Sequence, residues 1–121
     1  MNETTGRGSS YPSRRDICEV GRRIYQRGYV AANDGNISAR IGADRILCTP
    51  TGVSKGYIVE DMLTVCDMSG KQVSGALEIS SEIRMHLEIY QLRADINAIV
   101  HAHPPTATGF AVAGIELTQC I

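Results

Sequence analysis

The sequence predicts an α/β domain of the α+β type, built around a mainly antiparallel sheet. Two segments repeat their apolar residues at helical spacing, and several short extended runs lie between them. The extended runs follow one another through short turns, which favours antiparallel pairing. At 121 residues the chain is long enough for one hydrophobic core and therefore one domain.

Composition and charge exclude several classes of protein. Hydrophobic residues make up 43% of the chain and charged residues 21%, as in ordinary globular proteins. Twelve basic residues stand against thirteen acidic ones without a block of like charge, so we expect no nucleic-acid partner. No secretory signal segment is recognisable, and no apolar run reaches the roughly 18 to 20 residues that span a bilayer, so we expect no membrane partner.

The cysteines indicate the compartment. They are scattered without a CxxC motif or any spacing typical of a metal site: Cys18, Cys48, Cys66 and Cys120. Free thiols are typical of a reducing environment, so we expect a soluble, cytoplasmic protein.

The first helix is predicted over residues 14–27, after a flexible N-terminal tail of residues 1–12. Residues 13–121 are expected to belong to one domain. Ser13 is a suitable N-cap, and Gly28 stands where a left-handed C-terminal residue is common. The apolar positions of this helix are Ile17, Val20, Gly21, Ile24 and Tyr25.

A β-hairpin is predicted next. The alternating residues Ile37, Ala39 and Ile41 lead through the turn "GAD" to a second extended run at 45–50. After a polar loop, "MLTVCD" is predicted to form a third strand, and "MSGK" turns the chain into a short edge segment around Gln72.

A second helix is predicted to begin near Ser80 or Ser81 and to end near Arg93. Its apolar stripe is expected to contain Ile83, Leu87 and Tyr90. The segment "DINAIVHAH" lacks polar alternation, which predicts a strand that is buried on both faces.

This last strand ends in His101 and His103, followed at once by two prolines. The two-residue period of a strand places both imidazoles on one face. One interpretation is that polar residues mark the exit into solvent, where proline, which has no N–H, ends the ladder. The other is a metal site, because imidazole is a common zinc ligand. The pair alone does not decide, since a catalytic zinc site takes about three protein ligands.

Three polar clusters lie at predicted strand or helix ends: "GNIS" at 35–38, "TPTG" at 49–52 and "SSE" at 80–82. Glycine, hydroxyl groups and a helix N-terminus together can hold a phosphate, although each cluster also has an ordinary explanation as a turn or an N-cap. Glu82 either stabilises the first helical turn or acts beside the histidines. His86 is interpreted as an ordinary helix-surface or helix-packing residue.

Taken in order, GNIS, TPTG, SSE and HAH resemble the class II aldolase/adducin family, from about Ile17 to the last residue. The resemblance implies a three-layer architecture in which helices cover the antiparallel sheet. It implies that His101 and His103 are zinc ligands, and that Glu82 transfers the proton and can also contact the metal. It also implies a site for the substrate phosphate, formed by Gly35, Asn36, Thr51, Gly52, Ser80 and Ser81.

The activity implied by this resemblance is zinc-dependent retro-aldol cleavage of a phosphorylated ketose, similar to L-fuculose 1-phosphate, to dihydroxyacetone phosphate and an aldehyde. Aldolases of the family resemble this chain in having Glu after the two serines, whereas the 4-epimerases usually have Asp. The alternatives are a sugar-phosphate 4-epimerase, dehydratase or decarboxylase, and a non-catalytic adducin-like interaction module. The joint presence of His101, His103 and Glu82 counts against the last of these.

The sequence departs from the family pattern at two places. Ile79 stands where many relatives have proline before the two serines. The family also has a third histidine ligand well downstream and interface tyrosines beyond it, and the chain ends at Ile121 before either. We therefore expect the N-terminal portion of an enzyme nearly twice as long, which forms a homotetramer when complete, and we expect little activity from these 121 residues alone.

Overall fold

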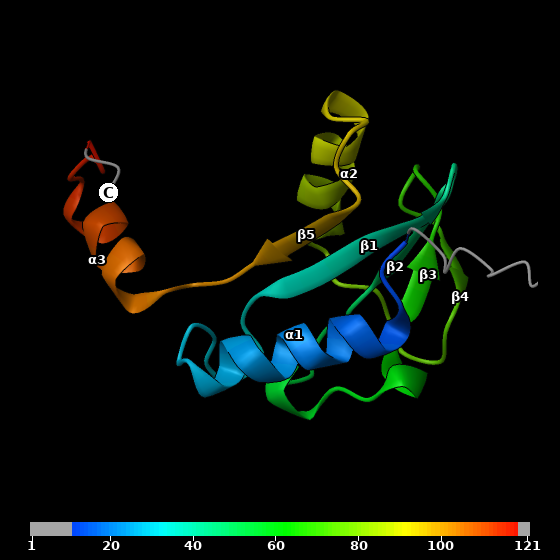
Figure 1. Cartoon of the computed structure of the whole chain (residues 1–121), viewed down its shortest axis with the longest axis horizontal. Coiled ribbons are helices and arrows are strands. Elements are labelled where there is room, and N and C mark those ends of the chain that lie inside the picture. The colour runs from blue at the N-terminus through cyan, green and yellow to red at the C-terminus, as the bar shows by residue number, and fades with distance from the viewer. Residues whose placement is uncertain (1–10, 119–121) are drawn as a thin grey trace, which may run out of the picture.

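Five strands form one sheet in the order β4-β3-β2-β1-β5 in the computed structural model, which describes residues 11–118 (Figure 1). Each neighbouring pair is antiparallel, which confirms the predicted sheet. The strands are β1 Asn36–Gly42, β2 Arg45–Cys48, β3 Thr64–Cys66, β4 Gln72–Ser74 and β5 Ala98–His101. The predicted hairpin, third strand and short edge segment are therefore present as β1 to β4.

Helix α1 (Arg14–Gln26) begins where the sequence predicts it. Ser13 and Asp16 form a reciprocal capping box, which provides partners for N–H groups that have none within the helix. Gly28, with a φ of 71°, follows the helix in the left-handed conformation. Most of the predicted tail, residues 1–10, lies outside the described residues.

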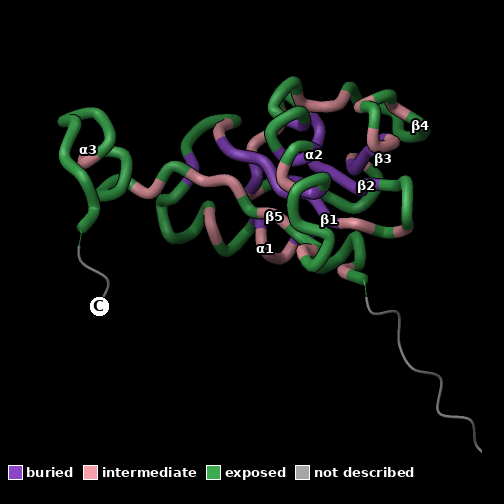
Figure 2. Tube along the Cα trace, turned by 90° about the horizontal axis from the view of Figure 1, so that it is seen from above, coloured by how far each residue is buried: buried purple, intermediate pink, exposed green. Residues whose placement is uncertain are grey.

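Helices α1 and α2 (Ile83–Leu92) cover opposite faces of the sheet, which gives the expected three layers. Ile17 and Cys18 of α1 pack against strand residues such as Ile37. On the other face, the predicted stripe of α2 packs against Ile46 and Cys66 and is buried: Ile83, Leu87 and Tyr90. The buried residues run through the middle of the sheet (Figure 2), because neighbouring side chains of the central strands alternate between the two cores.

Helix α2 begins later than the sequence predicts. The Ser80 hydroxyl accepts a hydrogen bond from the Glu82 backbone N–H at 3.3 Å, and the backbone N–H of Ile83 bonds to the Ser80 carbonyl. Residues 80–83 therefore form a tight turn, although they were expected to form the first turn of the helix. Glu82 is consequently the capping residue, and Ile83 is the first residue of the helix.

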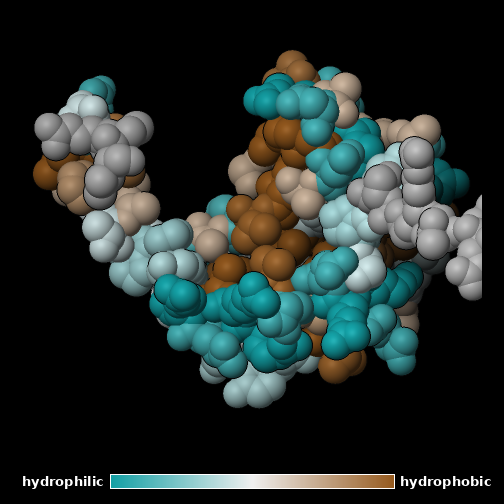
Figure 3. Space-filling view, in the orientation of Figure 1, coloured by the Kyte–Doolittle hydropathy of each residue, from teal (hydrophilic) through white to brown (hydrophobic). Residues whose placement is uncertain are grey.

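The prediction that the last strand is buried on both faces is wrong. Strand β5 is a short edge strand that pairs only with β1, and Val100 is 49% exposed. Its apolar composition does indicate a strand, but no described element covers its outer edge. Figure 3 shows apolar surface between α1 and α2 that is open to solvent.

Helix α3 (Pro105–Ala113) was not predicted from the sequence, and no residue in it is buried. It extends away from the sheet beyond β5 (Figures 1 and 2). Its apolar residues do not recur on one face of the helix, so the periodicity of the sequence does not indicate a helix here. Pro105 does suit the first helical position.

Two short 3₁₀ helices, η1 (Lys55–Tyr57) and η2 (Glu60–Met62), complete the fold. Within residues 11–118, no helix is both long and apolar enough to cross a bilayer. Cys18, Cys48 and Cys66 are buried free thiols, and Cys120 lies outside the described residues.

Candidate functional site

Sheet register and one loop contact bring the four motifs to the same end of the molecule. Asn36 pairs with His101 across β1 and β5, so "GNIS" and "HAH" are neighbours. An isolated bridge joins Pro50 to Ile79, and the Thr51 backbone N–H donates to the Glu78 carbonyl at 2.9 Å. These contacts place "TPTG" beside "SSE", although about thirty residues separate them in the chain.

A cleft of about 200 Å³ lies between these motifs. Five of the six residues predicted for the phosphate site line it: Gly35, Thr51, Gly52, Ser80 and Ser81. Asp34, Lys55, Glu82 and His103 also line the cleft. An adjoining hollow of about 510 Å³ shares Thr51, Ser80 and Ser81 with it. Three residues that carry hydroxyl groups therefore line this part of the cleft, and hydroxyl groups can donate hydrogen bonds to a phosphate.

Gly35 is required by the local packing. Its φ is 73°, and a Cβ at this position would lie 2.6 Å from the His101 carbonyl oxygen and 2.8 Å from Cγ1 of Val30. Only glycine lets the chain pass this close to β5. The same residue therefore lines the cleft and sets the position of the strand that carries His101.

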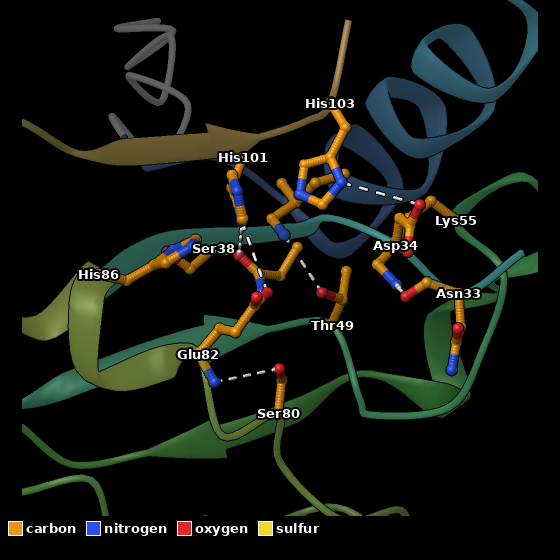
Figure 4. Close-up of polar contacts among 12 residues, drawn as sticks. Asn33, Asp34, Ser38, Thr49, Lys55, Ser80, Glu82, His86, His101 and His103 are labelled. Carbon is orange, nitrogen blue, oxygen red and sulfur yellow. Dashed lines mark hydrogen bonds and ion pairs between the residues drawn. The ribbon is translucent and has the colours of Figure 1, made fainter. Parts of the chain in front are cut away.

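The two predicted metal-binding histidines lie side by side, with ring centroids 4.9 Å apart (Figure 4). His103 lies beyond the end of β5 and is held by its backbone N–H, which donates to the Tyr29 carbonyl at 2.7 Å. Nδ1 of His101 lies 3.5 Å from Oε2 of Glu82. Nδ1 of His103 lies 3.7 Å from Oδ2 of Asp34. The spacing of the HxH motif thus produces the expected convergence, while the role of these side chains as ligands stays a prediction.

Asn36 lies behind the cleft and not on its wall, where the phosphate prediction put it. It is 4% exposed, and its amide nitrogen donates to Oε2 of Glu82. Its Oδ1 lies 2.5 Å from Nε2 of His86 and 3.3 Å from Nδ1 of His101. Asn36 therefore connects the carboxylate of the site with two of its imidazoles.

His86 is buried beneath this asparagine, so the helix-surface interpretation is wrong and helix packing is correct. It is 1% exposed, and burial, reinforced by nearby His101, lowers its pKa to about 4. The ring is neutral near neutral pH, so one nitrogen donates and the other accepts. Sequence reasoning missed its contact with the site. The available signal was its position four residues after Glu82, which places both on one side of the helix start.

Lys55 was also missed, because a single lysine in a polar loop carries no motif. Its side chain is buried, and Nζ donates to the carbonyls of Asn33 at 3.2 Å and Val53 at 2.8 Å. Burial lowers the pKa of Lys55, and the Glu82 and Asp34 carboxylates oppose that shift. A cation thus stands at the cleft beside two acidic side chains.

The donor set suits a divalent metal ion in its chemistry. Each of His101 and His103 directs Nδ1 toward a protein oxygen, which is how metal-binding histidines are commonly held while Nε2 is left for the metal. Carboxylate and imidazole are both zinc ligands. Within residues 11–118, no three His, Cys, Asp or Glu side chains are arranged so that they could hold an ion. The described part thus supplies two fitting imidazoles, with Glu82 beside the first.

Comparison with known proteins gives a consistent result. The family model described as "Class II Aldolase and Adducin N-terminal domain" matches residues 15–121. The chain is 38% identical to L-fuculose phosphate aldolase of Methanococcus maripaludis over 79% of its own length and 52% of that protein. It is 38% identical to 3-oxo-tetronate 4-phosphate decarboxylase of Haemophilus influenzae, over 78% of this chain and 45% of that protein.

A third relative has yet another activity in its name. The chain is 37% identical to methylthioribulose-1-phosphate dehydratase of Granulibacter bethesdensis, over 80% of this chain and 45% of that protein. A solved structure of L-fuculose 1-phosphate aldolase superposes with a TM-score of 0.78 at 32% identity, covering 89% of this chain and 53% of that one. The chain spans about half the length of the curated relatives it matches.

Proposed function

The chain belongs to the class II aldolase and adducin family, and we propose that the whole protein is a metal-dependent aldolase that cleaves a phosphorylated ketose. The observation that carries this proposal is the convergence of Glu82, His101 and His103 beside a cleft that Thr51, Ser80 and Ser81 line. An acid–base group beside two imidazoles and an anion-binding wall is the combination that such a reaction needs.

The phosphate group of the substrate is assigned to the wall formed by the "TPTG" and "SSE" motifs. The hydroxyls of Thr51, Ser80 and Ser81 lie at this wall and can donate to phosphate oxygens. Gly52, with a φ of 72° and no side chain, lets an anion approach the backbone closely. Binding at this wall fixes one end of the sugar, so that its reacting carbons face Glu82.

Glu82 is assigned the proton transfer. In the cleavage direction, the Glu82 carboxylate accepts the proton that the substrate hydroxyl loses as the C–C bond breaks, and then delivers this proton to the carbon that becomes part of the ketone product. The Asn36 amide holds one carboxylate oxygen, which restricts the direction of this transfer. A zinc ion held by His101 and His103, with Glu82 beside it, would supply positive charge that polarises the substrate oxygens.

The names of the relatives include a decarboxylase and a dehydratase at nearly the same identity as the aldolase. All of these names describe chemistry on a phosphorylated sugar or sugar acid, so the wall formed by the "TPTG" and "SSE" motifs could bind the phosphate group in each case. The resemblance of "SSE" to the aldolase pattern favours the aldolase. We also propose that the whole protein is a homotetramer, as the family resemblance implies.

The experiment uses the whole protein with L-fuculose 1-phosphate, and measures dihydroxyacetone phosphate with a coupled NADH assay. We expect cleavage that a chelator abolishes and added zinc restores. The parallel substrates are 3-oxo-tetronate 4-phosphate, with release of CO₂ measured, and methylthioribulose 1-phosphate, with loss of water measured. Faster turnover of either one than of the ketose phosphate would replace the aldolase assignment with that activity.

A further inference from the structure

The negative charge of the cleft opposes the binding of a phosphate, and the wall formed by the "TPTG" and "SSE" motifs carries no positive side chain to offset it. Asp34 and Glu82 both line the cleft, and a phosphate dianion would add two more negative charges beside them. Among the described residues that line this cleft, Lys55 is the only lysine or arginine. A cation is needed to make the site attractive to a dianion, and Lys55 is the group available.

The ammonium group of Lys55 is buried and incompletely bonded. The side chain is 2% exposed, and Nζ donates to two backbone carbonyls, those of Asn33 and Val53. An ammonium carries three protons, and the third has no hydrogen-bond acceptor among residues 11–118. The two carbonyls are neutral, so they orient the group without cancelling its charge. The Glu82 and Asp34 carboxylates favour the charged form of this group, and a phosphate oxygen would supply the acceptor that the third proton lacks.

The segment that carries Lys55 is held firmly in place. A Cβ on Gly21 of α1 would lie 2.6 Å from the Lys55 carbonyl oxygen, so α1 and η1 are in direct backbone contact. Figure 4 shows Lys55 next to Asp34, across the site from Glu82. The ammonium is therefore positioned before any ligand arrives, which reduces the entropy lost on binding.

We propose that Lys55 is the cationic contact for the substrate phosphate, and that it makes the site selective for phosphorylated over unphosphorylated sugars. The inference rests on the proposed function, because it takes the ligand of the hydroxyl wall to be a phosphate group. The third N–H bond of the ammonium donates to a phosphate oxygen, while its other two bonds keep their backbone carbonyls. The hydroxyls of Ser80 and Ser81 then satisfy the remaining oxygens.

The test compares Lys55→Met and Lys55→Gln in the whole protein. Lys55→Gln keeps N–H donors for the backbone carbonyls but removes the charge. Lys71→Met is the matched control, because Lys71 is the only other lysine of the chain and is exposed. Arg84→Met removes the guanidinium that lines the adjoining hollow. Isothermal titration of metal-free protein with inorganic phosphate gives the affinity, and KM is compared for L-fuculose 1-phosphate and free L-fuculose.

We expect both Lys55 variants to bind phosphate roughly 10- to 100-fold more weakly, as for the loss of one charge-assisted hydrogen bond. KM for the phosphorylated ketose should rise by a similar factor, while KM for the free ketose changes less than about 3-fold. Lys71→Met and Arg84→Met should bind phosphate like the wild type.

Four results would overturn the proposal. The first is phosphate binding by Lys55→Gln that is as strong as in the wild type, and the second is weaker phosphate binding by Arg84→Met. The third is an equal rise in KM for both ketoses in the Lys55 variants. The fourth is a wild-type protein that binds no phosphate. An equal rise would show that Lys55 only holds the backbone carbonyls. The binding measurement also separates the two proposals: Lys55-dependent phosphate binding without cleavage of any sugar phosphate would remove the aldolase assignment and leave the role of Lys55 intact.

Discussion

The Ser38 hydroxyl oxygen lies 2.6 Å from Nδ1 of His86, and both residues are buried between β1 and α2. His86 is neutral near neutral pH, with a pKa of about 4, so only one of its nitrogens donates. The amide nitrogen of Asn36 donates to Glu82, which leaves Oδ1 of Asn36 to accept from Nε2 of His86. Nδ1 consequently accepts from Ser38. A single buried chain of hydrogen bonds therefore fixes the direction in which Glu82 points.

The first prediction concerns the loss of this chain. His86→Phe fills a similar volume but removes one hydrogen-bond partner from the Asn36 oxygen, which keeps His101, and one from the Ser38 hydroxyl, which keeps Tyr90. We expect the free energy of unfolding to fall by about 2 to 4 kcal/mol, because buried polar groups lose their hydrogen bonds. Urea denaturation measures this, and Glu88→Ala, an exposed change on the same helix, is the control. A loss no larger than that of the control would show that the buried chain contributes little.

The second prediction is a pH dependence of stability. His86 has a pKa of about 4 in the folded protein and about 6.5 when unfolded, so between these values the unfolded chain binds the extra proton. Stability due to this residue is complete above about pH 6.5 and falls as the pH drops toward 4, by up to roughly 3 kcal/mol.

The measurement for this prediction is urea denaturation at about pH 7.5 and about pH 5, for the wild type and His86→Gln. The wild type should lose more stability than the variant between the two values, since glutamine does not titrate. Identical losses would mean that His86 is not held neutral by burial.

The sequence predicts most of the fold because its local signals agree with one another. The capping box at Ser13, the turn "GAD" and the stripe on α2 all act over a few residues, and the structure has each of them. Strand β5 shows the limit of this reasoning. Its apolar pattern identifies a strand, but whether a strand is central or at an edge depends on the order of the sheet, which the pattern does not contain.

The candidate site could likewise be predicted only in part from the sequence. The motif residues could be identified by their chemistry, and the two-residue period places His101 near His103. The roles of Asn36, His86 and Lys55 could not, because they depend on which side chains meet across β1, α2 and η1. A lone histidine on a helix and a lone lysine in a loop look like ordinary surface residues until their burial is known.

The third prediction compares two glycines with similar backbone conformations. Gly35 and Gly28 have φ values of 73° and 71°, but only Gly35 lies against other atoms. Gly28→Ala should cost about 1 kcal/mol for the left-handed backbone alone. Gly35→Ala should cost at least about 3 kcal/mol and displace His101, whose carbonyl would be 2.6 Å from the new Cβ. Thermal denaturation of both variants tests this. Equal costs would refute the close packing of Gly35 against β5.

The fourth prediction concerns Glu82 and rests on the proposed function. Glu82→Gln keeps an oxygen that can accept from the Asn36 amide but cannot transfer the proton. We expect kcat of the whole protein to fall about 10²- to 10⁴-fold, with phosphate affinity no weaker than that of the wild type, since the variant removes a negative charge from the cleft. Turnover assays and phosphate titration measure the two quantities. A variant with nearly full kcat would show that another group moves the proton.

The fifth prediction decides between the two interpretations of the histidine pair at the end of β5. If the pair binds metal, His101→Ala and His103→Ala in the whole protein should each weaken zinc binding at least about 10-fold, because each removes a ligand. Glu88→Ala, an exposed change on α2 that the site does not involve, is the control. Competition with a zinc-binding dye gives the affinities. If His101 and His103 only mark the exit of the strand into solvent, neither substitution will change zinc binding relative to that control, and the metal-dependent mechanism will lose its ligands.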